Sequence, residues 1–205
     1  MLNIILVIVI GYLLGSISTG VVISKALSKT DIRSHGSGNA GTTNMLRVLG
    51  RKAALLTFIG DMLKGIIAVF IGKWLVGGEL GGLLGVVGAV LGHYYPLYFG
   101  FKGGKGIATS FGSLLFVFPV QALLAFTVFL ILVGITHYVS VGSVAAAIAL
   151  PLLVVFTRFA QPQLWIITAC IGASVIWRHR ANIQRLMNHT ESKLDFSKLK
   201  GSKKA

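Results

Sequence analysis

Residues 3–24 read NIILVIVIGYLLGSISTGVVIS and contain no charged side chain. At a rise of 1.5 Å per residue, a helix over this stretch is about 33 Å long, which matches the roughly 30 Å hydrocarbon core of a bilayer. The stretch lacks the basic beginning and the cleavage site of a signal peptide. We therefore expect it to remain in the protein as a membrane-spanning helix.

Further apolar stretches follow along the chain, and 55% of the 205 residues are hydrophobic. None shows the alternation over about ten residues that marks the strands of a membrane β-barrel. We expect an all-α polytopic membrane protein, folded as a single integral membrane domain over residues 1–205. The expected helices are 3–24, 53–76, 80–98, 107–117, 119–137, 140–157 and 162–178.

The region 107–137 leaves two possibilities, because Pro119 can separate two helices or kink a single long one. Most of the 19 Lys and Arg residues fall in three clusters, at 25–52, 102–105 and 178–204. Seven helices place all three clusters on one side, which the positive-inside rule identifies as the cytoplasm. We therefore predict seven transmembrane helices, with the N-terminus outside, the C-terminus in the cytoplasm and a basic, flexible cytoplasmic tail at 187–205.

Four polar segments that are distant in sequence fall on the cytoplasmic side in this topology. They are HGSGNAGTTN (35–44), FKGGKG (101–106), THYVSVGS (136–143) and WRHRANIQRL (177–186). A single site composed of several segments requires such an arrangement.

The first polar segment is rich in glycine, and successive backbone N–H groups without side chains over them can bind an anion. The guanidinium of Arg47, just after it, can bind a phosphate through two hydrogen bonds. A flexible loop would have the same composition, so this segment alone leaves both interpretations open. Its candidate residues are Ser37, Gly38, Asn39, Thr42, Thr43 and Asn44.

The second polar segment is similar to a phosphate-binding P-loop, but its Gly–Lys order is reversed at Lys105 and Gly106. What remains is a lysine between glycines at the start of a predicted helix, where the helix dipole favours an anionic ligand. Anchoring at the membrane surface is the alternative role for such a lysine. We count Lys105 as a site candidate, together with Gly103 and Gly104.

The last polar segment places His179 and Asn182 three residues apart, so that one helical face can present both. The histidine can bind phosphate, carry a proton or be structural, and its position leaves these roles open. The neighbouring basic residues fit the role of interface anchors with snorkelling side chains: Arg178, Arg180 and Arg185.

Two charged residues, Asp61 and Lys64, lie inside the second predicted helix. Charges within the membrane usually face the interior of the bundle, and residues at i and i+3 can pair. We favour a structural ion pair over a contact with a ligand. The role of His93 is left undecided.

Several chemistries are excluded by composition. The chain has no Cys/His metal spacing, no HExxH motif and no GxSxG motif, and its five acidic residues are too few for a carboxylate cage around Mg²⁺. A single cysteine, Cys170, excludes an intrachain disulfide. The net charge of +14 is explained by the cytoplasmic basic clusters. We therefore expect no metal, no cofactor and no nucleic-acid partner.

The motifs GSGNAGTTN with Arg47, KGGKGIAT and HRANIQRL, in this order, resemble those of the bacterial acyl-phosphate:glycerol-3-phosphate acyltransferases. Members transfer a fatty acyl group from acyl phosphate to the 1-hydroxyl of glycerol 3-phosphate. The products are lysophosphatidic acid and phosphate, and the reaction is the first step of phospholipid synthesis. The His-x₄-Asp pair of other glycerolipid acyltransferases is absent, because five residues separate His189 from Asp195.

The resemblance implies a multi-pass protein of the bacterial inner membrane, in contact with lipid, whose active site faces the cytoplasm. It also implies direct, substrate-assisted transfer without an acyl-enzyme. A monomer is compatible with it. The implied catalytic residues are Ser37, Arg47, Lys105, His179 and Asn182. The implied substrate- or phosphate-binding residues are Gly38, Asn39, Thr43, Asn44, Gly103, Gly104 and Ser143.

Two alternatives belong to other functional classes. One is a transporter of a phosphorylated or anionic solute, since glycine-rich breaks are common at transporter sites. The other is a non-catalytic lipid-binding scaffold, which needs positive charge but no particular residue at His179.

Overall fold

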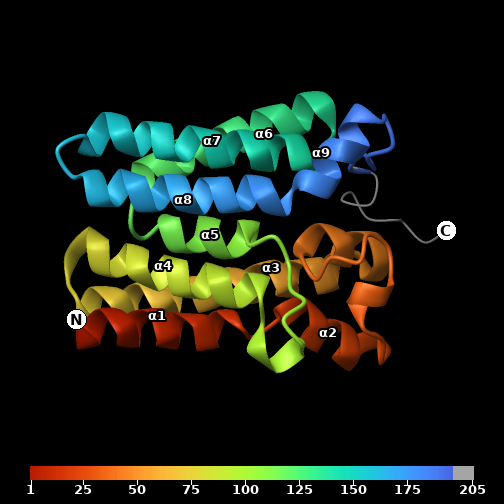
Figure 1. Ribbon diagram of the computed structural model, residues 1–205. Helices are drawn as coiled ribbons and strands as arrows, with labels where there is room; N and C mark the ends of the chain where they lie inside the picture. The colour runs from red at the N-terminus through yellow and green to blue at the C-terminus, as the bar shows by residue number, and fades with distance from the viewer. Residues whose placement is uncertain (196–205) are drawn as a thin grey trace.

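The computed structural model describes residues 1–195, in which every regular element is a helix (Figure 1). The prediction of an all-α protein is confirmed for this part of the chain. The elements, with 3₁₀ helices marked η, are α1 (Leu2–Gly15), α2 (Thr19–Ser28), η1 (Ile32–Ser34), α3 (Thr42–Leu75), α4 (Gly78–Tyr94), η2 (Leu97–Phe99), α5 (Ile107–Leu114), α6 (Pro119–Thr136), α7 (Val139–Arg158), α8 (Pro162–Arg178) and α9 (Arg180–Met187).

The long helices run side by side in two groups (Figure 1). The first group consists of α1 to α4, in which α1, α3 and α4 pack on one another. The second group consists of α6, α7 and α8, and α5 lies between the groups against α3. The space where the two groups meet is therefore bordered by elements from both halves of the sequence.

Five segments among residues 1–195 are long and apolar enough to cross a membrane: Leu2–Ser28, Thr42–Leu75, Gly78–Phe99, Pro119–Thr136 and Val139–Arg158. All five overlap predicted helices. The helix α8 has 17 residues. The helix α5 has eight, shorter than predicted, and at about 12 Å it does not cross a bilayer core. Several candidate spans are thus confirmed, whereas seven crossings remain a prediction.

The first predicted helix is interrupted, contrary to expectation. The helix α1 ends at Gly15 and α2 begins at Thr19. At the interruption, the buried ammonium of Lys64 in α3 donates a hydrogen bond to the carbonyl oxygen of Ile17, at 2.8 Å. The break is stabilised by a partner distant in sequence, which the apolar pattern of residues 3–24 does not reveal.

The second predicted helix starts earlier than 53, because α3 already begins at Thr42. It bends at Gly50, whose φ of 79° and ψ of −170° lie outside the helical region and favour glycine. The last three residues of the first polar segment, Thr42 to Asn44, and the following Arg47 are therefore helical rather than part of a loop.

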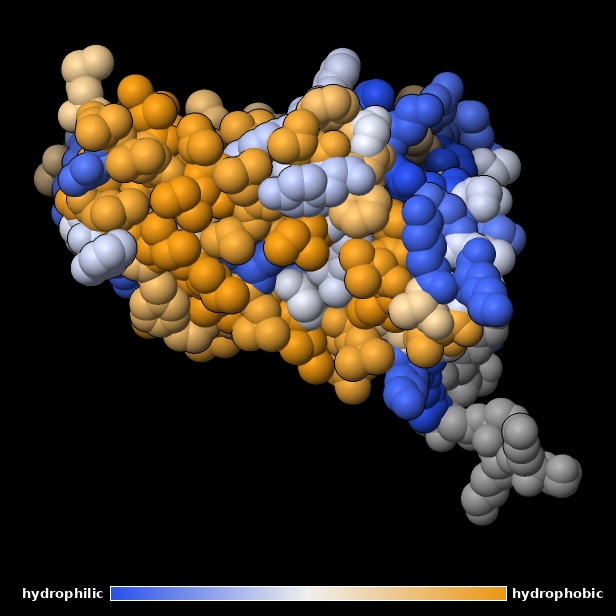
Figure 2. All heavy atoms as spheres, turned by 90° about the horizontal axis from the view of Figure 1, so that it is seen from below, coloured by the Kyte–Doolittle hydropathy of each residue, from blue (hydrophilic) through white to orange (hydrophobic). Residues whose placement is uncertain are grey.

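Glycines bring backbones into contact in the first group. A Cβ atom at Gly15 would lie 2.1 Å from the carbonyl oxygen of Ala89, and one at Gly92 would lie 2.1 Å from that of Tyr12. Small residues at such contacts are typical of packed membrane helices. Large apolar side chains face outward in the bundle as a whole, for example Phe156 of α7, which is 92% exposed. Figure 2 shows a broad hydrophobic surface on another face, next to hydrophilic residues gathered at one end.

The four polar segments lie at the same end of the bundle, as predicted (Figure 1). This end holds α2, the loops at 29–41 and 100–106, the start of α7, and α9. The opposite end holds the start of α1 and the turns that follow α3, α5 and α7.

Candidate active site

A cavity of about 280 Å³ lies at this end and is lined by residues of all four polar segments. We call it the polar cavity. Gly38, Gly103 and Gly104 are not among its lining residues. The predicted site residues that line it are Ser37, Asn39, Thr43, Asn44, Arg47, Lys105, Ser143, His179 and Asn182. The fold therefore brings nine of the twelve residues implied by the resemblance to one place, together with the further candidate Thr42.

The glycines of the second polar segment are used inside the protein. The backbone N–H of Gly103 donates to the carbonyl of Tyr94 (3.2 Å), and that of Gly104 donates to the carbonyl of His93 (3.1 Å). The pair supports the wall from which Lys105 extends. Their direct contact with phosphate stays a prediction.

Asn44 orders the first polar segment from within. Its side chain is buried, and its Oδ1 accepts a hydrogen bond from the backbone N–H of Ser37 at 2.9 Å. Its Nδ2 donates to the carbonyl oxygens of His35 and Asn39, both at 2.9 Å. Because the amide is largely occupied by these bonds, we interpret Asn44 as shaping the loop that presents Ser37 and Asn39.

Three helices begin at the polar cavity. Thr42 and Thr43 of α3, Ile107 and Ala108 of α5, and Val139 of α7 all line it. The first backbone N–H groups of a helix have no partner within the helix, and the helix dipole favours negative charge there. The cavity is therefore suited to phosphate even apart from its charged side chains.

A chain of polar contacts crosses the cavity. The ammonium of Lys105, in the loop before α5, donates to Oδ1 of Asn182 on α9. Nδ2 of Asn182 donates to Oε1 of Glu191 (2.6 Å), which also accepts from Oγ of Ser140 (2.9 Å). Nε of Arg185 donates to the other carboxylate oxygen of Glu191, at 2.7 Å. These bonds fix the orientation of the Asn182 amide, with its oxygen toward Lys105.

Burial changes the protonation of two groups here. It lowers the pKa of Lys105 to about 8, with Glu191 opposing the shift and three nearby arginines adding to it. It also lowers the pKa of His179 to about 4, with a contribution from the cation of Lys105. At neutral pH Lys105 is thus largely cationic and His179 is neutral. Nδ1 of His179 lies 2.8 Å from the carbonyl oxygen of Val175, so Nδ1 carries the proton and Nε2 is an acceptor.

The predicted pair of Asp61 and Lys64 is present, and His93 extends it. Nζ of Lys64 lies 2.9 Å from Oδ1 of Asp61 and 2.9 Å from Nδ1 of His93. All three side chains are buried, and Asp61 and His93 reach the wall of the polar cavity. Among residues 1–195 no three His, Cys, Asp or Glu side chains are grouped so as to hold a metal ion.

The model of the family described as "Glycerol-3-phosphate acyltransferase" matches residues 5–189. The glycerol-3-phosphate acyltransferase of Clostridioides difficile is 46% identical over 199 residues, covering 95% of this chain and 97% of that protein. The enzyme of the same name from Syntrophotalea carbinolica is 48% identical, covering 89% of this chain and 93% of its own length. The chain belongs to the glycerol-3-phosphate acyltransferase family.

Solved structures of this family agree with the fold. The crystal structure of PlsY (YgiH), an integral membrane glycerol 3-phosphate acyltransferase, in its glycerol 3-phosphate form has a TM-score of 0.88 and 37% identity, covering 97% of this chain and 99% of that one. Its lysophosphatidic acid form has a TM-score of 0.84, with 96% and 97% covered. The family predicted from the three motifs is confirmed, and the transporter and scaffold alternatives are set aside.

Sequence reasoning missed several features of the polar cavity. Glu191 lies in the predicted tail 187–205, yet it is bonded within the cavity, and the backbone N–H of Leu194 donates to the carbonyl of His137 at 2.7 Å. The only signal in the sequence was the rarity of acidic residues. Arg178, predicted as a membrane anchor, instead donates to the carbonyl of Gly104 at 2.8 Å. Residues 196–205 of the predicted tail lie outside the described residues.

An apolar cavity of about 130 Å³ was also missed, because its lining comes from five helices with ordinary apolar side chains. It lies mainly among α5, α6, α7 and α8, and Phe58 of α3 completes its lining. It shares five lining residues with the polar cavity, namely Phe58, Ile107, Ala108, Phe129 and Ser143.

Proposed function

We propose that the chain transfers a fatty acyl group from acyl phosphate to the 1-hydroxyl of glycerol 3-phosphate, giving lysophosphatidic acid and inorganic phosphate. One observation carries the proposal: the polar cavity and the apolar cavity share five lining residues. A phosphate and the long acyl chain attached to it can therefore occupy adjoining spaces. Family membership supports the acceptor and the product.

The phosphates are bound by charge and by donors. Arg47 and Lys105 supply cations at the polar cavity, and Ser37, Asn39 and Thr43 supply hydrogen-bond donors. The beginnings of α3, α5 and α7 add backbone N–H groups. Two phosphorylated substrates can thus be placed close together, with their charge neutralised by groups that are already in position.

The chemical step is a direct transfer. The 1-hydroxyl oxygen attacks the acyl carbonyl carbon, the bond from that carbon to the phosphate oxygen breaks, and the hydroxyl proton passes to the departing phosphate. Nε2 of neutral His179 accepts a hydrogen bond from the other hydroxyl of glycerol 3-phosphate, which orients the acceptor and leaves the proton of the 1-hydroxyl to pass to the phosphate. Lys105, oriented by Asn182, stabilises the charge on the leaving phosphate. No acyl-enzyme forms, and neither metal nor cofactor takes part.

We further propose the predicted membrane arrangement: seven crossings, the N-terminus outside, and the C-terminus and site in the cytoplasm of a bacterial cell, with the protein in its inner membrane. The concentration of basic residues at the site end supports this orientation. We also propose that a monomer suffices, since the residues to which we assign roles gather around one cavity of the same chain.

The test uses purified protein in lipid with synthetic palmitoyl phosphate and glycerol 3-phosphate. We expect equal amounts of phosphate and lysophosphatidic acid, and no product from palmitoyl-CoA. His179→Ala should lower kcat by about 100-fold or more without changing the melting temperature.

Phosphate release without lysolipid would identify the activity as an acyl phosphatase and overturn the proposed acceptor. Comparable turnover with palmitoyl-CoA would overturn the proposed donor.

A further inference from the structure

The loop from Tyr95 to Gly106 carries Lys105 into the polar cavity with a backbone that needs outside support. Gly100, Phe101 and Gly106 all have positive φ, at 67°, 58° and 75°. This conformation is sterically unfavourable for Phe101, since left-handed backbone brings the Cβ atom of a residue too close to its own main chain. Contacts from other elements must therefore hold the loop.

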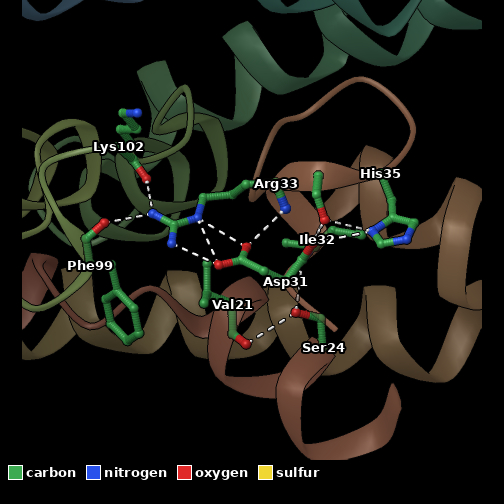
Figure 3. Close-up of polar contacts among 9 residues, drawn as sticks. Val21, Ser24, Asp31, Ile32, Arg33, His35, Phe99 and Lys102 are labelled. Carbon is green, nitrogen blue, oxygen red and sulfur yellow. Dashed lines mark hydrogen bonds and ion pairs between the residues drawn. The ribbon is translucent and has the colours of Figure 1, made fainter. Parts of the chain in front are cut away.

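Arg33 of η1 holds one side of this loop, as Figure 3 shows. Its Nη1 donates to the carbonyl oxygens of Phe99 (2.6 Å) and Lys102 (2.9 Å). The rest of the guanidinium is bound by the carboxylate of Asp31, from Nε at 3.0 Å and from Nη2 at 2.7 Å. The hydrogen bond from Arg33 lowers the pKa of Asp31 to about 2, so the carboxylate remains charged throughout the physiological range.

Arg178 at the end of α8 holds the other side. It donates to the carbonyl oxygens of Gly103 (3.2 Å) and Gly104 (2.8 Å), and its guanidinium lies 5.3 Å from the ring centre of Tyr94. The residues just before Lys105 are thus fixed between two arginines. Because a peptide C=O and the following N–H point in opposite directions, fixing the carbonyls also fixes the direction of the chain at Lys105.

We propose that Arg33 is a positioning residue for Lys105. It does not line the polar cavity. It acts through the main-chain carbonyls of Phe99 and Lys102, which set the place from which the ammonium reaches Asn182. The inference rests on the proposed role of Lys105 in the transfer. A lysine cannot take the place of Arg33, because an ammonium is a point charge without a planar fork for two carbonyls and a carboxylate.

Arg158 provides a matched control at the opposite end of the bundle. It binds Glu79 through two nitrogens, at 3.0 and 2.8 Å, and donates to one carbonyl, that of Thr157. Its side chain is 35% exposed, against 23% for Arg33. We expect Arg33→Lys and Arg33→Ala to lower kcat for palmitoyl phosphate and glycerol 3-phosphate by about 10- to 100-fold. The same changes at Arg158 should leave kcat within twofold.

A double-mutant cycle distinguishes positioning from a general structural role. In a Lys105→Ala background, Arg33→Ala should change the residual rate by less than about twofold, because its target is already gone. If the two losses multiply, or if Arg33 and Arg158 variants lose activity equally, the proposal is wrong. Failure of the proposed function would appear separately, as no turnover by the unmodified protein.

A second measurement does not require turnover, and it applies if the residual rates of the Lys105→Ala variants are too low to compare. The pH dependence of labelling of Lys105 by an amine-reactive reagent reports its pKa. Lys105 faces Glu191 and Arg185 near α9, Arg178 and His179 at the end of α8, and Arg47 of α3. Arg33→Ala should raise the pKa of Lys105 from about 8 toward 10.5 as the freed loop becomes more hydrated. An unchanged labelling curve would overturn the proposal.

Discussion

The two helix groups meet at the polar cavity but are built differently. In the most apolar stretch of α4, at the centre of the first group, 67% of the residues are buried, against 22% in α6 and in α7. The first group joins backbone to backbone at glycines and encloses Asp61 and Lys64. The second group has fewer such contacts, for example at Gly172, and surrounds the apolar cavity mainly with side chains. We infer that many of the proposed contacts to phosphate, such as those of Asn39, Thr43 and Arg47, are placed on the dense group because they need fixed geometry, whereas the acyl chain needs only volume.

The largest effect is expected from a substitution that disrupts the close backbone packing of the first group. Gly92→Leu should abolish the folded protein, because its Cβ would lie 2.1 Å from the carbonyl oxygen of Tyr12 and neither backbone can move away. Gly134→Ala in α6 is the control, since nothing lies within 4 Å of its added Cβ. Yield of monodisperse protein and melting temperature measure both. A folded Gly92→Leu protein would remove the contrast between the groups.

The next effect concerns the charges enclosed in the first group. Lys64→Met leaves the Asp61 carboxylate buried without its cation, which should destabilise the protein by about 3–5 kcal/mol. Arg158→Met, which breaks the partly exposed pair with Glu79, should cost about 1 kcal/mol or less.

Thermal unfolding in the same lipid measures both variants. Adding Asp61→Leu to Lys64→Met should recover part of the lost stability, because it removes the unpaired charge. Equal losses for the Lys64 and Arg158 variants would show that the enclosed pair has no special energetic role.

The positions of helices could be predicted from the sequence where a local pattern of residues determines them. The bounds of α6, α7 and α8 follow from apolar length and from Pro119 and Pro162, which begin helices. The motifs supplied twelve candidate site residues, of which nine line the polar cavity, and their roles remain predictions. The break between α1 and α2 was not predictable, because Lys64 stabilises it from another helix. Glu191 was missed for the same reason, since its partners come from two other helices, Ser140 from α7 and Asn182 and Arg185 from α9.

A smaller effect should follow from filling the apolar cavity. Ala146 lines it, and Ala146→Phe places a ring where the acyl chain is proposed to lie. The ratio of kcat/KM for palmitoyl phosphate to that for octanoyl phosphate should fall by roughly 10-fold or more, since a shorter chain needs less of this volume. Leu152→Phe, at a position 63% exposed on the outer surface of α7, should leave the ratio unchanged. A uniform loss for both donors would indicate that the chain lies elsewhere.

The smallest effect at neutral pH should come from Lys105→Arg, at the boundary between the groups. Lys105 is active in the transfer as the cation. We therefore expect kcat/KM to have its full value below a pH of about 8, where the free enzyme carries the protonated lysine, and to decline as the pH rises through this value. Arginine stays protonated throughout this range, so the variant should keep its activity to higher pH. The amide oxygen of Asn182 lies where it accepts a hydrogen bond from the ammonium of Lys105. Because a guanidinium is larger, we expect the variant to react a few-fold more slowly at pH 7. If the alkaline decline of the variant coincides with that of the unmodified protein, another group titrates there and Lys105 does not act through its charge.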